Sequence, residues 1–411
     1  MNVNNNTPDI RFSGFGGDWN KRKLAELVQP VSSYPLSRGV EVNEDTKYRY
    51  IHYGDIHRGK LKVIKSEKQL SNIPMGNYEL LEKGDLVVAD ASEDYEGIAN
   101  PCVLDYELQD KVVAGLHTIA MRPINTDSLY LYNLFHTDSF KSHGRFIGTG
   151  TKVFGISAKN LLKFESFVPE LNEQAAIGNI FKHIDKAIAL SRSKQAKTKM
   201  LKNAFLIKMF PQTGKSQPEI RLKGFSGNWV ERKLGDISNT FSGGTPSVGY
   251  SDFYGGKIPF IRSGEISSYT TSLFLTEEGL INSSAKLVDK GNILYALYGA
   301  TSGEVSISNI NGAINQAILA IIPFKEYNTE FISYWLRRDK YRIIDTYLQG
   351  GQGNLSGDII KNLVLKIPSK LQEQTAIGNF FKQLDDTLAL QAKQLKALEN
   401  LKKALLAKMF V

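Results

Sequence analysis

Hydrophobic residues near the end of the chain recur with the spacing of one helix face. The apolar positions in this stretch are Ile377, Phe381, Leu384, Leu388, Leu395, Leu398 and Leu405. Their three-and-four spacing is held for about five heptads without a proline, which predicts one long amphipathic helix. At about 1.5 Å per residue, such a helix is on the order of 55 Å long.

The same helix is present twice. Residues 173–190 read EQAAIGNIFKHIDKAIAL, residues 373–390 read EQTAIGNFFKQLDDTLAL, and both stretches later end on Lys-Met-Phe, at 208–210 and 408–410. The apolar stripe of the first copy comprises Ile177, Phe181, Ile184, Ile188, Leu201 and Phe205. A lone amphipathic helix leaves its apolar seam in water, so we expect each copy to pack against the other. The alternative is that each helix packs on a separate core.

The remainder of the chain is also duplicated. PDIRFSGFGGDWNKRKLAEL at 8–27 matches PEIRLKGFSGNWVERKLGDI at 218–237, so Trp19 corresponds to Trp229. Strand-like runs at 50–56, 83–88 and 112–123 match runs at 260–266, 290–295 and 312–323, and helices are predicted at 128–143 and 329–347. We predict domains at 1–169 (1–7 loose) and 219–368, long helices at 170–210 and 369–411, and a linker at 211–218.

Composition limits the class of protein. The 411 residues carry a formal charge of +9 and 42% hydrophobic residues, which is ordinary for a soluble protein of two or three domains. Cys102 is the single cysteine, so neither a disulfide framework nor a cysteine zinc site is expected. The Asn-rich N-terminus does not resemble a signal peptide, and no apolar run reaches membrane-spanning length. We therefore expect a cytoplasmic protein.

Motifs for catalysis are weak. Residues 12–16 fit a short methyl-donor pattern, but the second copy loses it, and residues 213–216 imitate a phosphate-binding loop without its first glycine or a preceding strand. The six histidines all lie in the first half, whereas a duplicated metal site requires a second set. We therefore predict no catalytic residue, no metal and no cofactor on this chain.

The chain resembles the specificity subunit of type I restriction–modification systems. The resemblance covers nearly the whole chain and depends on the paired EQ-x-AIG-x-FK helices ending in KMF, the GF-x-G-x-W-x-x-RKL segments and the two Gly-rich loops at 148–152 and 350–354. It implies an α+β fold, in which two similar mixed α/β target-recognition domains are joined by two long antiparallel helices, a coiled coil with pseudo-two-fold symmetry.

The resemblance also implies the function. Each globular half reads one part of a bipartite asymmetric site on double-stranded DNA, and the helices set the spacing and dock two adenine methyltransferase subunits, which two motor–nuclease subunits join. S-adenosylmethionine, ATP and Mg²⁺ are then expected on those partners. The alternatives are a self-sufficient methyltransferase or nuclease, and a coiled-coil scaffold that does not bind DNA.

DNA-reading side chains are expected in loops that carry planar or bidentate groups, because arginine pairs with guanine, and asparagine or glutamine with adenine. The candidates in the first half are Tyr48, Arg49, His52, Arg58, Lys141, His143, Arg145, Thr149, Thr151 and Lys152. Those in the second half are Thr245, Ser247, Arg262, Tyr298, Thr301, Ser302, Gln349, Gln352 and Asn354. A plain surface role is the alternative for each. The basic run on the first long helix is interpreted either as a solvated face or as a contact for phosphate or a partner.

Overall fold

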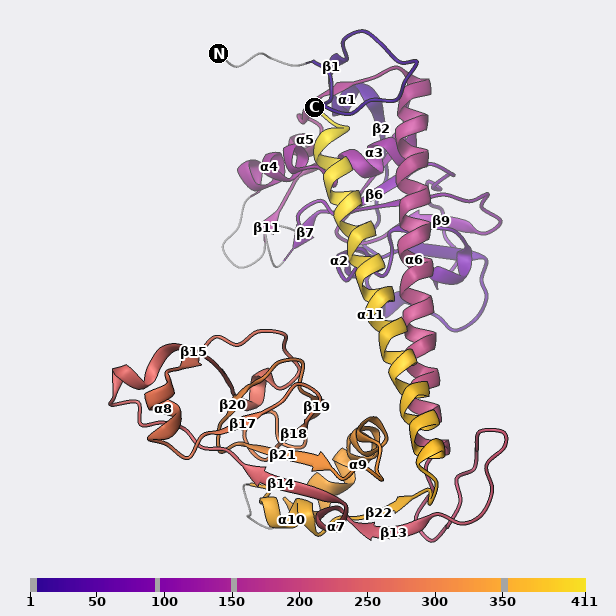
Figure 1. Ribbon diagram of the computed structural model, residues 1–411. Coiled ribbons are helices and arrows are strands. Elements are labelled where there is room, and N and C mark those ends of the chain that lie inside the picture. The colour runs from indigo at the N-terminus through magenta and orange to yellow at the C-terminus, as the bar shows by residue number, and fades with distance from the viewer. Residues whose placement is uncertain (1–5, 93–96, 149–153, 349–353) are drawn as a thin grey trace. The chain divides into compact units, whose positions relative to one another are not determined.

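A computed structural model describes residues 6–92, 97–148, 154–348 and 354–411 (Figure 1). The chain forms two compact units. The first contains residues 1–192 and 393–411, and the second contains residues 193–392. Each unit therefore combines one globular half with the first part of one long helix and the last part of the other.

The first unit is built from short strands, short helices and α6 (Figure 1). Its strands are β1 Asn20–Lys23, β2 Val28–Val31, β3 Tyr48–Ile51, β4 Val63–Ile64, β5 Ser71–Asn72, β6 Leu86–Ala89, β7 Ala91–Ser92, β8 Pro101–Leu104, β9 Lys111–Ala114, β10 Thr118–Pro123, β11 Phe154–Gly155 and β12 Glu165–Val168. Its helices are α1 Leu24–Leu27, α2 Tyr53–His57, α3 Ser128–Leu134, α4 Asp138–Ile147, α5 Ala158–Leu161 and the opening part of α6 Leu171–Lys208.

The second unit repeats this order, with fewer strands among its described residues. Its strands are β13 Val230–Lys233, β14 Ser238–Ser242, β15 Tyr254–Ile261, β16 Phe274–Leu275, β17 Lys286–Val288, β18 Ile293–Ala296, β19 Val305–Ile307, β20 Gly312–Ile314, β21 Ile318–Pro323 and β22 Val364–Ile367. Its helices are α7 Leu234–Ile237, α8 Glu277–Ile281, α9 Thr329–Tyr347, α10 Gly357–Lys361 and the opening part of α11 Leu371–Lys408.

The sheets of the two units share a common order of four strands, to which the first unit adds β4. The order β2-β10-β6-β8 in the first unit matches β14-β21-β18-β19 in the second, and a parallel pair, β3-β9 or β15-β20, lies in a second sheet. The central strands β6 and β18 are buried along their whole length. Alternate residues of β6 face different cores, with Leu86 and Val88 on one side and Val87 and Ala89 on the other. A strand buried on both faces reads as a continuous apolar run.

The long helices pair antiparallel within each unit. In the first unit, Asp185 near the start of α6 accepts a 2.6 Å contact from Lys402 near the end of α11, and Arg192 lies 2.7 Å from Glu399. In the second unit, Gln391 on α11 donates to Thr198 on α6 at 3.2 Å. These contacts lie along the line where the two helices face each other, which we call the seam. The hydrogen bond between Gln391 and Thr198 makes the centre of the seam polar.

The structure places most of the predicted seam residues on this seam. Six are buried, and six are partly covered. The buried positions are Ile177, Phe181, Ile184, Ile188, Ile377 and Phe381, and the partly covered ones are Phe205, Leu384, Leu388, Leu395, Leu398 and Leu405. Leu201 is a correction, because its side chain is 52% exposed. The heptad step from Thr198 is four residues rather than three, so Lys202 takes the seam position and contacts Asp385.

The repeated EQ-x-AIG motif is a structural clamp. Gln174 accepts a hydrogen bond from the Asp127 backbone N–H at 2.9 Å and donates to the Pro169 carbonyl at 2.8 Å. A Cβ on Gly178 would lie 2.6 Å from the Asp127 carboxylate, so only glycine lets α6 approach α3 this closely. Glu173 is buried and receives two 2.7 Å hydrogen bonds from Arg11. The second copy repeats the glutamine hydrogen bonds, the close approach at the glycine and the arginine–glutamate pair at its matching positions.

The Lys-Met-Phe endings close the cores. Phe410, at the end of α11, stacks on Tyr130 with ring centroids 5.3 Å apart and belongs to the core of the first unit. Phe210, at the end of α6, is fully buried in the core of the second unit beside Trp229. Each helix therefore starts on one core and ends in the other.

Several predicted elements are divided in the structure. The helix expected at 128–143 is two helices, because Thr137 caps α4 by accepting a hydrogen bond from the Phe140 N–H. The strand expected at 50–56 ends at Ile51 and is followed by α2. The strands expected at 112–123 and 312–323 are each broken by a turn, at 115–117 and 315–317. The helix expected at 329–347 has the predicted bounds.

Candidate nucleic-acid interface

The turns at 115–117 and 315–317 lie at corresponding points of the two units. In the first unit, the Asp90 N–H donates to the His117 carbonyl at 3.1 Å, and the Asp90 carbonyl accepts from Ile156 at 2.8 Å. In the second unit, Leu297 donates to Ala317 at 2.8 Å, and its carbonyl accepts from Leu355 at 3.0 Å. We call this three-segment meeting point the junction: Asp90, 115–117 and Ile156 in one unit, and Leu297, 315–317 and Leu355 in the other. Its backbone is the same in both units, but its side chains differ.

The junction of the first unit carries an acid, an imidazole and aromatic rings. His117 Nδ1 lies 3.2 Å from Asp90 Oδ1, and both side chains are partly exposed. The His117 ring meets the edge of Tyr53 at 5.3 Å, and Tyr53 lies 4.6 Å from His52. Burial raises the pKa of the Asp90 carboxyl, an effect that the neighbouring His117 opposes. This cluster can offer an acceptor and an N–H donor to a ligand.

The junction of the second unit carries neutral polar groups instead. Thr245 donates a hydrogen bond to the side-chain oxygen of Gln316, which is exposed, and Gln316 also hydrogen-bonds Tyr298. Burial raises the pKa of Tyr298, so its phenol stays neutral. A Cβ on Gly243 would lie 1.9 Å from the Ile314 carbonyl oxygen, so this glycine allows the loop that carries Thr245 to approach the turn.

Candidate residues on β3 and α2 mostly have structural partners. Arg49 binds the carboxylates of Asp110 and Asp45, each at 2.9 Å. His52 is buried, and its Nδ1 accepts the Gly54 N–H at 3.0 Å, so it caps α2. The exposed Arg58 ends that helix. Tyr48 contacts Lys111, whose ammonium lies 4.8 Å from the ring centroid.

Candidate residues on α4 form a second group. Lys141 and His143 are partly buried, and His143 Nε2 lies 3.3 Å from the Asn160 carbonyl. Arg145 is exposed, donates to Ser142 at 3.0 Å and precedes the 89% exposed Phe146. Five further candidates lie outside the described residues: Thr149, Thr151, Lys152, Gln349 and Gln352.

Candidates in the second half gather more closely around their junction. Thr245 and Tyr298 share Gln316, and the turn containing Thr301 and Ser302 follows directly, with Ser302 donating to the Leu297 carbonyl at 3.1 Å. The exposed Ser247 and Asn354 lie in adjoining loops. Arg262 is instead held by Glu265 at 3.1 Å and Ser272 at 2.6 Å.

Three junction residues were not among the sequence candidates: Asp90, His117 and Gln316. The sequence contains a pattern that indicates them. Each residue lies next to a strand whose sequence matches between the two halves, but the residue type at its own position differs between the halves. All three residues lie at positions beside the aligned strands where the side-chain chemistry differs between the two halves.

The comparisons with known proteins identify the family. The family model described as the type I restriction modification DNA specificity domain matches residues 16–200 and again 226–400. The chain belongs to this family. The putative type I restriction enzyme MjaX specificity subunit of Methanocaldococcus jannaschii is 23% identical over 95% of this chain and 92% of that protein. The MjaIX specificity subunit of the same organism is 27% identical, over 45% of this chain and 44% of that protein.

Solved structures share the fold. The S subunit of a type I restriction-modification system from M. genitalium superposes with a TM-score of 0.66 at 18% identity, covering 98% of this chain and 99% of that one. The predicted fold class, with two similar mixed α/β halves and two long helices, is confirmed.

Family membership also confirms the predicted role: a non-catalytic DNA-recognition subunit of a multisubunit type I system. Among the described residues, no helix has the length and apolar character needed to span a membrane. The individual DNA-reading residues remain predictions.

Proposed function

We propose that the chain reads a bipartite asymmetric DNA site, one half-site per unit, with the junction and its neighbouring loops as the reading surface. The observation that carries this proposal is the shared junction backbone with different side chains. Two equivalent scaffolds that present different donor and acceptor groups select different base sequences. The exposed amide of Gln316 can form paired hydrogen bonds with adenine, whereas His117 with Asp90 offers a different arrangement of hydrogen-bond donor and acceptor.

The long helices then set the distance between the half-sites. Each helix has 38 residues, or about 57 Å at the ordinary helical rise. Half-sites one turn of DNA apart are separated by about 34–36 Å, which a helix of this length can span. The polar centre of the seam, with Gln391 and Thr198, fixes the register of the helix pair more strictly than an apolar seam does.

The reaction belongs to other polypeptides. Two adenine methyltransferase subunits dock on the helices and globular halves, and two motor–nuclease subunits join them in the cytoplasm. The S-adenosylmethionine, ATP and Mg²⁺ that the reaction uses bind to those partners.

Spacer length tests the proposal. The assembled methyltransferase complex is titrated with duplexes whose spacer between the half-sites is two base pairs longer or shorter than in the natural site. Two base pairs rotate one half-site by about 70° and move it by about 7 Å, so affinity and methylation should fall sharply. Equal affinity for all three spacers would contradict the spacing role.

Junction substitutions test the assignment of the half-sites. Gln316→Ala should relax selectivity at one half-site, and His117→Ala at the other, each by about 1–3 kcal/mol of base discrimination. Sequencing of methylated random-site libraries measures both effects. A Leu297→Val variant, which changes an equivalent buried position without a polar group, is the matched control. Loss of selectivity at both half-sites from either polar substitution would contradict one reader per half-site.

A further inference from the structure

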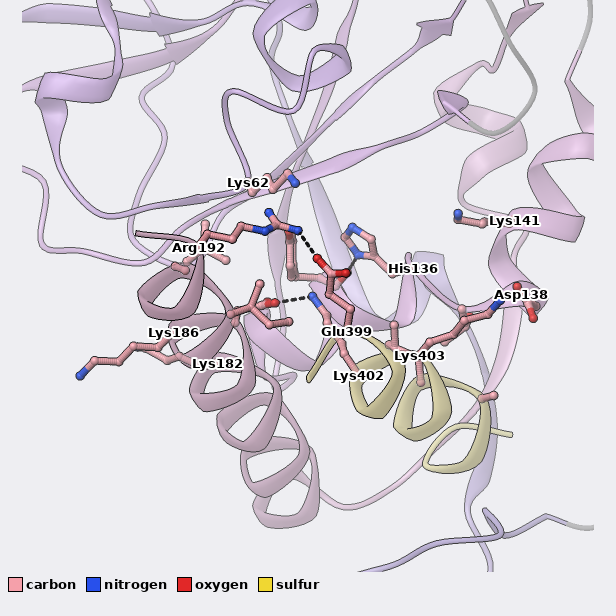
Figure 2. A pocket seen from close by; sticks show the side chains of 18 of the residues that line it. Lys62, His136, Asp138, Lys141, Lys182, Lys186, Arg192, Glu399, Lys402 and Lys403 are labelled. Carbon is pink, nitrogen blue, oxygen red and sulfur yellow. Dashed lines mark hydrogen bonds and ion pairs between the residues drawn. The ribbon is translucent and has the colours of Figure 1, made fainter. Parts of the chain in front are cut away.

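The first unit contains a large basic pocket where its globular part meets the two long helices. The pocket has a volume of about 690 Å³. It is lined by β4 and the residues on either side of it, by the segment from the end of α3 to the start of α4, and by facing turns of α6 and α11. Eight cationic side chains and three carboxylates line it. Figure 2 shows the labelled charged groups arranged around the Arg192–Glu399 pair.

Some of this charge is neutralised within the pocket. Arg192 lies 2.7 Å from Glu399, Lys402 lies 2.6 Å from Asp185, and Lys182 reaches Asp105 at 2.7 Å. These pairs use two of the three lining carboxylates and fix the cations that bind them. Two of the pairs, Arg192–Glu399 and Lys402–Asp185, join α6 to α11, and Lys182–Asp105 joins α6 to the segment after β8.

Three other lysines that line the pocket lack an ion-pair partner among the described residues. Within the described parts of the chain, Lys62, Lys65 and Lys403 form no ion pair, and their side chains are exposed. They approach the pocket from different elements, Lys62 and Lys65 from around β4 and Lys403 from α11 (Figure 2 labels Lys62 and Lys403). Lys186 also lines the pocket, but its amine points away from the centre in Figure 2. Unpaired ammonium groups that border one pocket from separate elements can together attract a multiply charged anion.

The pocket also has a neutral part. Ile188, Ala189 and Leu406 provide apolar wall, and Tyr132 and His136 also line the pocket. His136 Nδ1 contacts the Tyr132 carbonyl at 2.7 Å and therefore carries the proton, which leaves Nε2 as an acceptor. Burial lowers the pKa of His136 to about 4, so the ring is neutral at physiological pH. Cations with an apolar wall and one acceptor suit a phosphorylated organic group.

The matching place in the second unit carries an arginine with internal partners. Aligning the caps Asp127 and Asn328 puts Arg337 at the position of His136. The Arg337 guanidinium lies 3.4 Å from Asp385 and donates to the Val305 carbonyl at 3.0 Å. Tyr334 donates to Asp385 at 2.7 Å, and Lys202 contacts the same carboxylate. The carboxylate that matches Asp185 is thus satisfied by three internal groups.

We propose that the pocket of the first unit is a binding site for phosphate groups, held by Lys62, Lys65 and Lys403. The same anionic oxygens can come from a free nucleoside polyphosphate or from the backbone of bound DNA. Either ligand would tie α4 to the helix pair, because α4 contributes Asp138 and Lys141 to the pocket and carries the candidate residue Arg145 two turns of chain further on. The backbone source rests on the proposed DNA function, whereas the free source does not.

The first measurement uses the full-length chain without DNA. Tripolyphosphate and ATP are titrated by calorimetry into the wild type, a K62Q/K65Q/K403Q variant and a K68Q/K159Q/K163Q control, which removes equal charge from exposed lysines of the same unit outside the pocket. For a free-phosphate source we expect saturable binding that weakens at least about tenfold in the pocket variant alone, because one charge-assisted contact is worth about a factor of ten.

The second measurement uses the assembled complex and its DNA site over a range of salt concentrations. Each phosphate contact contributes about 0.9 to the slope of log affinity against log salt, so a backbone source should reduce the slope by about 2–3 in the pocket variant. The control should keep the wild-type slope, and selectivity between sequences should stay unchanged in both variants. A general failure of DNA binding by the wild type would contradict the proposed function and leave the calorimetric result to decide the pocket.

The outcomes separate the sources. Tripolyphosphate binding lost only in the pocket variant assigns a free ligand, and a reduced slope without tripolyphosphate binding assigns the DNA backbone. If the pocket variant matches the wild type in both measurements, or if the control loses as much as the pocket variant, the site does not exist. Because all three pocket lysines are exposed, melting temperatures should be equal, and a single K403Q variant repeats the test with minimal change.

Discussion

Phe210 provides a direct test of how the second unit is held together. Its side chain is 0% exposed, and its ring contacts Phe331 at 5.3 Å, Phe381 at 5.9 Å and Trp229 at 6.1 Å between centroids. Phe210→Ala removes the ring from three facing aromatic groups, none of which can fill the space without leaving its own contacts. Truncation of a buried phenylalanine costs about 3–5 kcal/mol.

That cost translates into a measurable melting shift. For a unit of about 200 residues, each kcal/mol lowers the melting temperature by about 2–4 °C, so Phe210→Ala should lower that of the second unit by roughly 6–20 °C. Urea unfolding followed by hydrogen exchange and mass spectrometry assigns the loss to peptides of either unit. Ile207→Ala, which changes an exposed position on the same helical end, should cost less than about 0.5 kcal/mol. Equal loss of protection in both units would refute the division of the cores, and a change below about 1 kcal/mol would refute the role of Phe210.

Three further predictions concern the first unit. Arg11→Met leaves the Glu173 carboxylate buried without its partner, so it should lower the free energy of unfolding in urea by about 3–5 kcal/mol. Adding Glu173→Gln should restore much of this stability, and a double variant that is no more stable than Arg11→Met would refute the pairing. His136 has a folded pKa of about 4, below the unfolded value near 6.5, so the unfolded state binds more protons in this range: stability is complete above pH 6.5 and falls by up to about 3 kcal/mol as the pH drops toward 4. His136→Gln should flatten this decline in unfolding experiments at pH 7.5, 6 and 5, and an unchanged slope would disprove it. If the chain is expressed as two separate fragments, 1–210 and 211–411, each should lack part of a core and should become compact only when the two are mixed. Gel filtration and circular dichroism measure this, and a 1–210 fragment that is compact alone would contradict it.

The sequence predicts the framework well because the framework is local and repeated. The period of the long helices, the bounds of α9, and the glycine turns at Gly84 and Gly291 before β6 and β18 all follow from spacing and turn chemistry. The strand expected at 112–123 was wrong in its middle, where Gly115 donates to the Ile51 carbonyl at 2.9 Å and Leu116 to Leu36 at 3.2 Å. Those bonds join segments far apart in the chain, so no local pattern reveals the break.

The candidate site was predicted less completely for the same reason. Arg49 looked suited to guanine, yet its guanidinium is committed to two carboxylates, and the pairing with Asp110 depends on β3 lying beside β9. Gln316 was passed over because it was read as part of a strand. Thr245 and Tyr298, which share Gln316, are candidates that the structure does bring together. In the long helix, one miscounted heptad step placed Leu201 where Lys202 lies.

The placement of the last residues has a consequence for biosynthesis. The second unit is a single uninterrupted stretch, 193–392, whereas the first needs 393–411 to supply Phe410. A ribosome therefore releases everything the second unit requires while the first still lacks its final piece. The globular half that is translated first therefore has its core completed last, when residues 393–411 have been synthesised.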